Sequence, residues 1–97
     1  MFAQAKNHTI YVRGKGVSDK SKTEVSSLGA DTLQVSPGQD VREFVVSIKT
    51  MQGSILFQQV LVACYEDCYT FIAPDIPNGY YLEVRDDRGY IYKEIEN

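Results

Sequence analysis

One stretch of this 97-residue chain decides its fold class: Pro77-Asn78-Gly79-Tyr80-Tyr81-Leu82-Glu83-Val84-Arg85-Asp86-Asp87-Arg88-Gly89-Tyr90-Ile91-Tyr92. Between Tyr80 and Arg85 the side chains alternate in character with a period of two residues, which is typical of a half-buried β-strand. Gly89 follows three polar residues, as in a short hairpin loop that ends in a left-handed residue. The stretch therefore predicts a turn, a strand, a tight turn and a second strand.

Short strand-like runs continue through the rest of the chain. They cover residues 9–13, 31–35, 41–49, 54–63, 69–73, 80–85 and 90–95, and turn-forming residues separate most of them. The polar residues 14–27 are predicted to form a long mobile loop, with Val17 and Val25 as its anchors. About seven strands at this spacing, without a helix, predict an all-β fold, namely an immunoglobulin-like antiparallel β-sandwich.

Two of the predicted hairpins share a sequence pattern. Residues 46–55 and 82–91 both read apolar, polar, β-branched, basic, three turn residues, glycine, any residue and isoleucine. In each hairpin the glycine, Gly53 or Gly89, can adopt positive φ and let a type I turn close with a bulge. The pattern predicts two similar hairpins, which belong to one sheet in an immunoglobulin-like sandwich.

Length and composition narrow the class of protein. We expect one domain with a modest core, residues 7–97. The formal net charge of −3 gives no electrostatic footprint for nucleic acid or an anionic membrane. No apolar run approaches the ~20 residues of a membrane helix. Residues 1–6 are interpreted as a signal-peptide remnant, because Ala3 and Ala5 match the small-x-small pattern of a signal-peptidase site, or as a disordered N-terminus.

Three short motifs in the C-terminal half of the chain are similar to those of a known family. They are Gly53 with Ser54-Ile55-Leu56-Phe57, then Ile76-Pro77-Asn78-Gly79-Tyr80-Tyr81-Leu82-Glu83-Val84, then Asp87-Arg88-Gly89. Together they resemble small exported immunoglobulin-like domains of unknown function from gut commensal bacteria, and they are similar to the C-terminal sorting domains of the type IX secretion system. The resemblance implies an exported β-sandwich. It also implies that Asp31-Thr32-Leu33 is an acceptor for bacterial O-glycosylation at Thr32. The alternative is that this tripeptide is simply the start of a strand.

Candidate catalytic and metal-binding residues are few. Cys64 and Cys68 flank a predicted hairpin end, where an intramolecular disulfide, two free thiols and an intermolecular bridge are all allowed. Two cysteines and one distant histidine cannot complete a closed zinc site, so we predict neither a metal nor a cofactor. His8 is the only histidine, and its polar surroundings predict an exposed residue without a chemical role. With no nucleophile and base in evident proximity, we predict that the chain is not an enzyme.

Four tyrosines gather on the last predicted hairpin: Tyr80, Tyr81, Tyr90 and Tyr92. Either Tyr80 is buried with Leu82, or a bulge shifts the register and buries Tyr81. If the isoleucines of the last strand face the core, Tyr90 and Tyr92 are exposed beside Tyr81. Such tyrosines suit contact with protein or carbohydrate, and the alternative is cross-strand packing on the outer face of a sheet.

The sequence thus predicts an exported interaction module, in the periplasm, at the cell surface or outside the cell. It is expected to bind a protein or glycan partner through Tyr81, Tyr90 and Tyr92, and to be a monomer or a weak dimer. The alternative is a secretion or sorting module that an export machinery recognises through its last two strands.

Overall fold

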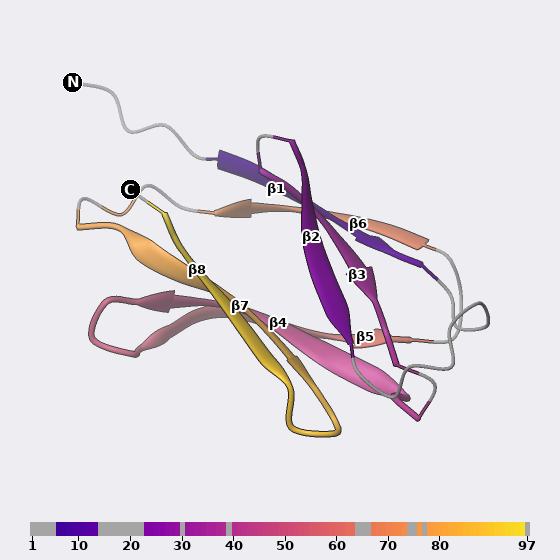
Figure 1. The fold of residues 1–97 in the computed structure, drawn as a ribbon. Coiled ribbons are helices and arrows are strands. Elements are labelled where there is room, and N and C mark those ends of the chain that lie inside the picture. The colour runs from indigo at the N-terminus through magenta and orange to yellow at the C-terminus, as the bar shows by residue number, and fades with distance from the viewer. Residues whose placement is uncertain are drawn as a thin grey trace.

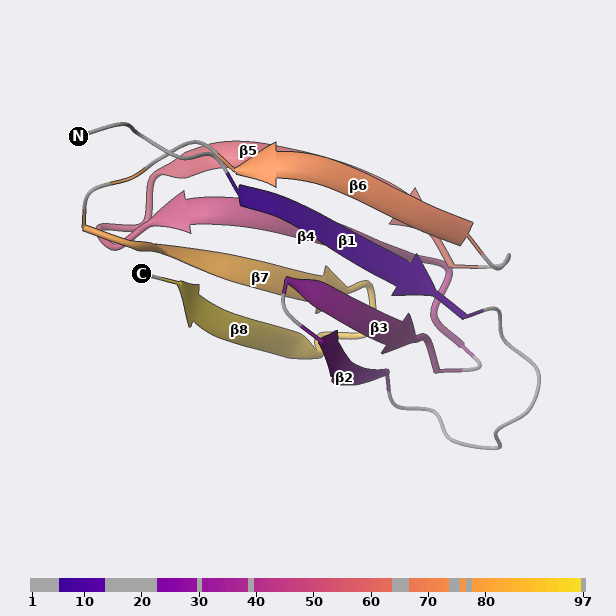
Figure 2. The same ribbon diagram turned by 90° about the horizontal axis from the view of Figure 1, so that it is seen from above.

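Eight β-strands form the regular structure in the computed structural model, which describes residues 6–13, 23–29, 31–38, 40–63, 67–73, 76 and 78–96. The strands are β1 (Lys6–Val12), β2 (Glu24–Gly29), β3 (Thr32–Ser36), β4 (Glu43–Thr50), β5 (Ile55–Val62), β6 (Asp67–Ala73), β7 (Tyr80–Asp86) and β8 (Ile91–Glu96). They make two four-stranded sheets, in the orders β2-β3-β1-β6 and β5-β4-β7-β8, which pack face to face (Figures 1 and 2). The predicted all-β sandwich is confirmed. Within the described ranges, no helix is long and apolar enough to cross a membrane.

The second sheet contains both predicted hairpins, and its strand pairs are all antiparallel. Strands β4 and β7 lie side by side at its centre, β5 forms one edge, and β8 forms the other. The prediction of two similar hairpins in one sheet is therefore confirmed.

The two hairpins close with equivalent hydrogen bonds. In the first, the amide of Thr50 donates to the carbonyl of Ser54 at 2.8 Å, and the Thr50 hydroxyl accepts from the Ser54 amide at 3.0 Å. In the second, the amide of Asp86 donates to the carbonyl of Tyr90 at 3.0 Å, and the Asp86 carboxylate accepts from the Tyr90 amide at 2.9 Å. The shared pattern thus reflects a shared turn, in which a side-chain oxygen four residues upstream caps the returning strand.

Both turns depend on a glycine with positive φ. Gly53 has φ +96° and Gly89 has φ +98°, and nothing lies within 4 Å of a Cβ added at either residue. We therefore expect Gly53→Ala and Gly89→Ala each to lower the free energy of unfolding by about 1–2 kcal/mol through backbone strain alone. Urea denaturation measures the loss. Equal stability of both variants and the parent would contradict the turn geometry.

The first sheet differs from the sequence prediction in one strand. Residues 24–29 form β2, although residues 14–27 were expected to be loop; residues 14–22 lie outside the described ranges. Among the described strands, β2 pairs with β3 alone and so lies at the edge of its sheet. Of its six residues only Val25 is half-buried, and the other five are exposed. An edge strand with one inward apolar side chain carries almost no hydrophobic period, so the prediction was wrong here.

Strand β1 lies between β3 and β6, parallel to β3 and antiparallel to β6. An immunoglobulin sheet instead joins its strands in the order A-B-E-D. The order β5-β4-β7-β8 matches the order C′-C-F-G of the second immunoglobulin sheet. The order β2-β3-β1-β6 does not match A-B-E-D, because β1 lies between β3 and β6. The immunoglobulin-like part of the fold therefore stays a prediction.

The core lies between the two sheets and is made by alternate residues of the central strands. Fully buried apolar side chains include Ile10, Val12, Val35, Phe44, Val46, Ile48, Leu82 and Val84. Tyr80 belongs to the same inward row and is only 5 % exposed, whereas Tyr81 is half-buried on the outer face. Tyr80 is therefore the buried tyrosine of the two, and no bulge interrupts β7 where it pairs with β4.

Candidate functional site

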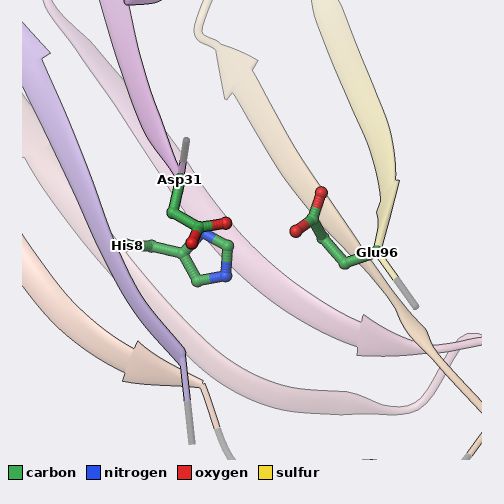
Figure 3. Close-up of side chains that lie close together, drawn as sticks. All are labelled: His8, Asp31 and Glu96. Carbon is green, nitrogen blue, oxygen red and sulfur yellow. The ribbon is translucent and has the colours of Figure 1, made fainter. Parts of the chain in front are cut away.

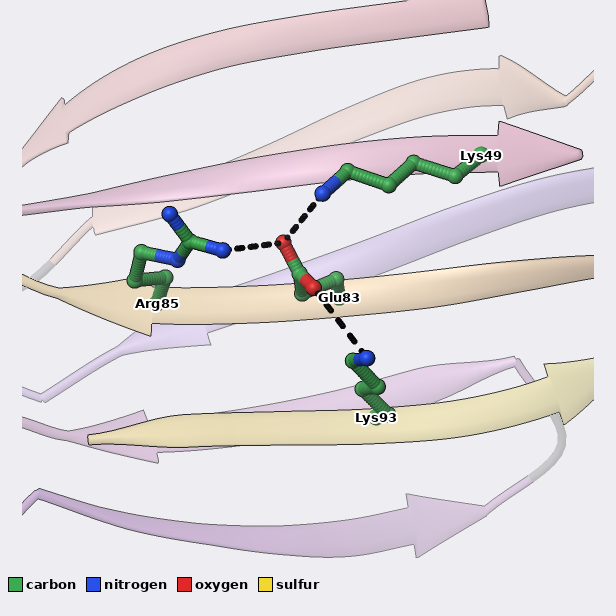
Figure 4. A network of polar contacts seen from close by, with 4 residues as sticks. All are labelled: Lys49, Glu83, Arg85 and Lys93. Carbon is green, nitrogen blue, oxygen red and sulfur yellow. Dashed lines mark ion pairs between the residues drawn. The ribbon is translucent and has the colours of Figure 1, made fainter. Parts of the chain in front are cut away.

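An ion cluster occupies the centre of the outer face of the second sheet (Figure 4). Glu83 on β7 is 3 % exposed although it points away from the core. Its carboxylate lies 3.0 Å from Lys49 Nζ, 3.6 Å from an Arg85 guanidinium nitrogen and 3.9 Å from Lys93 Nζ. Three cationic side chains therefore cover one carboxylate and shield it from water.

The register of the sheet places these charges together. Glu83 pairs with Lys93 of β8 directly, Lys49 is the diagonal neighbour on β4, and Arg85 follows two residues later on the same face. Cross-strand and diagonal neighbours are close enough for long side chains to meet. Three cations and one carboxylate give the cluster a formal charge of +2, on a chain whose formal net charge is −3. The centre of this face is therefore locally positive.

Exposed apolar side chains flank the ion cluster at both edges of the sheet. On β5, Ile55, Val60 and Val62 are 54 %, 55 % and 52 % exposed, and their partners on β4 are outward-facing residues. On β8, Ile91 and Ile95 are 47 % and 56 % exposed. Exposed apolar side chains gathered on one face, with polar groups among them, are typical of interaction surfaces.

Strand β5 differs from the other edge strands in its charge. It reads Ile-Leu-Phe-Gln-Gln-Val-Leu-Val and contains no charged residue, whereas β2, β6 and β8 each contain at least one. Among the described strands, only β4 pairs with it. Soluble proteins usually protect edge strands with charges, proline or bulges against pairing with another chain. The eight-residue β5 has one register irregularity, close to its start, and no charge.

The predicted tyrosine surface is not a single surface in the structure. Tyr81 lies on the outer face opposite Ile95, with Lys93 Nζ 5.7 Å from its ring centre. Tyr92 lies on the opposite face, opposite Val84, and is half-buried. Tyr90 precedes β8 and is also half-buried. The condition for exposing these tyrosines, isoleucines that face the core, is not met, and their role in binding stays a prediction.

The environment of Tyr92 shifts its acidity. Burial raises the pKa of the Tyr92 hydroxyl, and the nearby Glu94 carboxylate, whose oxygen lies 3.4 Å from that hydroxyl, raises the pKa further. Tyr92 therefore remains a neutral donor between the sheets, and it serves packing and hydrogen bonding there.

His8 is buried, so the prediction of an exposed histidine was wrong. It is 1 % exposed, its Nε2 lies 2.6 Å from the Tyr80 hydroxyl, and its ring stacks on Phe71 at 5.6 Å between centres. The alternation that continues from Ile10 back to His8 is the signal that could have placed it inside. Donor atoms of Asp31 and Glu96 lie within 4.8 Å of one another and of the imidazole (Figure 3).

The remaining predicted site residues lie apart from both clusters or outside the described residues. Cys68 is exposed on β6, and Cys64 is among the residues that the structure does not describe, so the disulfide stays a prediction. Thr32 begins β3 and is half-buried beside Asp31. Its glycosylation also stays a prediction.

Comparison with protein-family models, with curated proteins and with solved structures finds no match to this chain.

Proposed function

We propose that this chain is a secreted or cell-envelope interaction module, without catalytic activity, that binds an extended segment of a protein partner along β5. The observation that carries the proposal is the composition of β5, an eight-residue edge strand with no charge. An exposed edge offers a row of backbone donors and acceptors to an added strand, and pockets or apolar rows beside it provide specificity.

The side chains of β5 favour a protein strand over a glycan. Val60 and Val62 are adjacent aliphatic residues on the outer face of β5, and Ile55 lies on the same face beyond Gln58. Carbohydrate-binding surfaces use exposed aromatic rings, and Tyr81, the one tyrosine that the described strands of this sheet place on its outer face, is half-buried. Aliphatic side chains beside a strand edge that no other described strand covers suit the alternate apolar residues of an added strand.

The positive charge of the neighbouring ion cluster indicates which charge the partner segment carries. Lys49, Arg85 and Lys93 share the single carboxylate of Glu83, which leaves the centre of the face positive. A partner segment with apolar residues over β5 and an acidic residue toward the ion cluster is complementary to both features.

Peptide selection tests this function with a matched pair of variants. A displayed library of short peptides is selected for binding to the wild-type chain. The affinities of the selected peptides are then measured for the wild type and for the Val60→Lys and Ile95→Lys variants. The two positions have nearly equal exposure, 55 % and 56 %, and lie at opposite edges of the same face. We expect Val60→Lys to weaken binding about tenfold or more, which corresponds to ~1.4 kcal/mol, and Ile95→Lys to leave it nearly unchanged.

The opposite ranking of the two variants, or a selection without any β5-dependent binder, would contradict the proposal. The alternative, a sorting module that an export machinery recognises, predicts a different effect of these variants. It predicts that variants in β7 and β8 reduce export from the cell, whereas Val60→Lys does not.

A further inference from the structure

A cluster of three metal-type ligands closes one end of the sandwich. His8 comes from β1, Asp31 from the turn before β3, and Glu96 from the end of β8, so the cluster joins the two sheets. One donor atom of each residue lies within 4.8 Å of the others. Figure 3 shows the Asp31 carboxylate against the imidazole, with the Glu96 carboxylate facing them from the other sheet.

The imidazole of this cluster is held as a metal-bound histidine usually is. It is 1 % exposed, and Phe71 stacks on one side of the ring. Its Nε2 lies 2.6 Å from the Tyr80 hydroxyl. In metal sites the second ring nitrogen normally makes such a hydrogen bond, which fixes the tautomer and the ring orientation. With Nε2 hydrogen-bonded to Tyr80, Nδ1 would be the ring nitrogen that coordinates a metal.

We propose that His8, Asp31 and Glu96 bind a first-row divalent cation, with zinc the best match, and that Tyr80 orients the imidazole. One nitrogen and two carboxylate oxygens suit zinc, whereas calcium and magnesium take oxygen ligands. A dication at this point would be attracted by both carboxylates, whose donor atoms lie within 4.8 Å of each other and of the imidazole. This site is separate from β5 and does not depend on the proposed function.

The geometry requires only small movements of the ligands. Zinc binds these donors at about 2.0–2.2 Å and usually has four ligands, so its donors lie roughly 3–3.5 Å apart. Asp31 and Glu96 are half-buried at the end of the sandwich, where water can supply the fourth ligand. Because Glu96 belongs to β8, the ion would tie the last strand to the first sheet.

Calorimetric titration of zinc chloride into the purified chain tests the site. We expect one zinc per chain, and a melting temperature that rises with zinc concentration because the ion binds only the folded site. Asp31→Asn and Glu96→Gln should each weaken binding at least tenfold. Tyr80→Phe should weaken it about 10- to 100-fold, as expected for a residue that orients a ligand.

Two controls make the test specific. Glu94→Gln removes a half-buried carboxylate two residues before Glu96, on the same face of β8, and should leave the affinity unchanged. The double variant Cys64→Ser, Cys68→Ser removes the thiols as competing zinc ligands and should bind as the wild type does. Absence of zinc binding by the wild-type chain, or binding that survives Asp31→Asn and Glu96→Gln, would overturn the proposal; so would loss of binding in the cysteine variant.

Discussion

Replacing Asp86 with alanine is expected to lower the free energy of unfolding by about 3–5 kcal/mol. The Asp86 carboxylate is buried and accepts three hydrogen bonds: from the Thr23 hydroxyl at 2.6 Å, the Arg88 amide at 2.8 Å and the Tyr90 amide at 2.9 Å. Alanine removes the shared acceptor and leaves these donors without it. The Thr23 hydroxyl also accepts a hydrogen bond from the Gly38 amide. The loss of Asp86 therefore also disturbs residues that flank the strands of the first sheet.

Asp86→Asn is the matched control for this prediction. Its side-chain carbonyl can still accept the two turn amides, whereas its amide group replaces the oxygen that faces Thr23. We therefore expect a smaller loss, about 1–2 kcal/mol. Urea denaturation with a common slope for all variants measures both values. Equal stability of the alanine variant and the wild type would show that Asp86 does not join the β7–β8 turn to Thr23.

Replacing Glu83 with glutamine is expected to lower the free energy of unfolding by about 2 kcal/mol. Removing one partner of a buried ion pair costs about 3–5 kcal/mol. We discount that value because the side chains of Arg85 and Lys93 are 52 % and 57 % exposed and can turn into water. Lys49, at 21 % exposure, is left without its closest carboxylate.

The salt dependence of unfolding separates this effect from lost packing. Salt should weaken the wild type more than Glu83→Gln, because screening acts on the ion cluster that only the wild type has. Identical salt dependence of the two chains would indicate that the cluster adds no electrostatic stability. Gln52→Glu, an exposed change in the turn between β4 and β5, serves as the surface control and should stay within about 0.5 kcal/mol of the wild type.

Local sequence patterns were sufficient for the hairpins and for the face of β7. The repeated turn pattern located Gly53 and Gly89, because positive φ restricts the choice of residue. The alternation of Leu82 and Val84 with Glu83 and Arg85 indicated the buried row of β7, but it left the choice between Tyr80 and Tyr81 open, and the regular pairing of β7 with β4 decides that choice for Tyr80. The turn pattern and this alternation are each determined within a few residues, so a single sequence contains that information, whereas a possible bulge beside Tyr80 depends on the partner strand.

The orientation of β8 could not be read from hydrophobicity. Its isoleucines face solvent, and Tyr92 and Glu94 face inward. The register of the hairpin determines this orientation, because Asp86 caps the turn and pairs Arg85 with Ile91. On an edge strand, few contacts oppose such a choice, so turn geometry prevails over side-chain hydrophobicity.

The buried cluster around His8 required information from distant parts of the chain. Asp31 reaches it from the turn before β3, and Glu96 reaches it from the last strand. Their meeting depends on the unusual position of β1 between β3 and β6. Sequence spacing does not specify which strands become neighbours, so neither carboxylate could be assigned to the histidine in advance.

Hydrogen–deuterium exchange on a complex with a selected peptide tests the central claim most directly. If the peptide adds a strand to β5, alternate amides between Ile55 and Val62 that point away from β4 become protected in the complex. Amides on the outer edge of β8, between Ile91 and Glu96, should exchange at the same rate with and without peptide. Protection confined to β8, or side-chain contact without protection of any β5 amide, would contradict strand addition at β5.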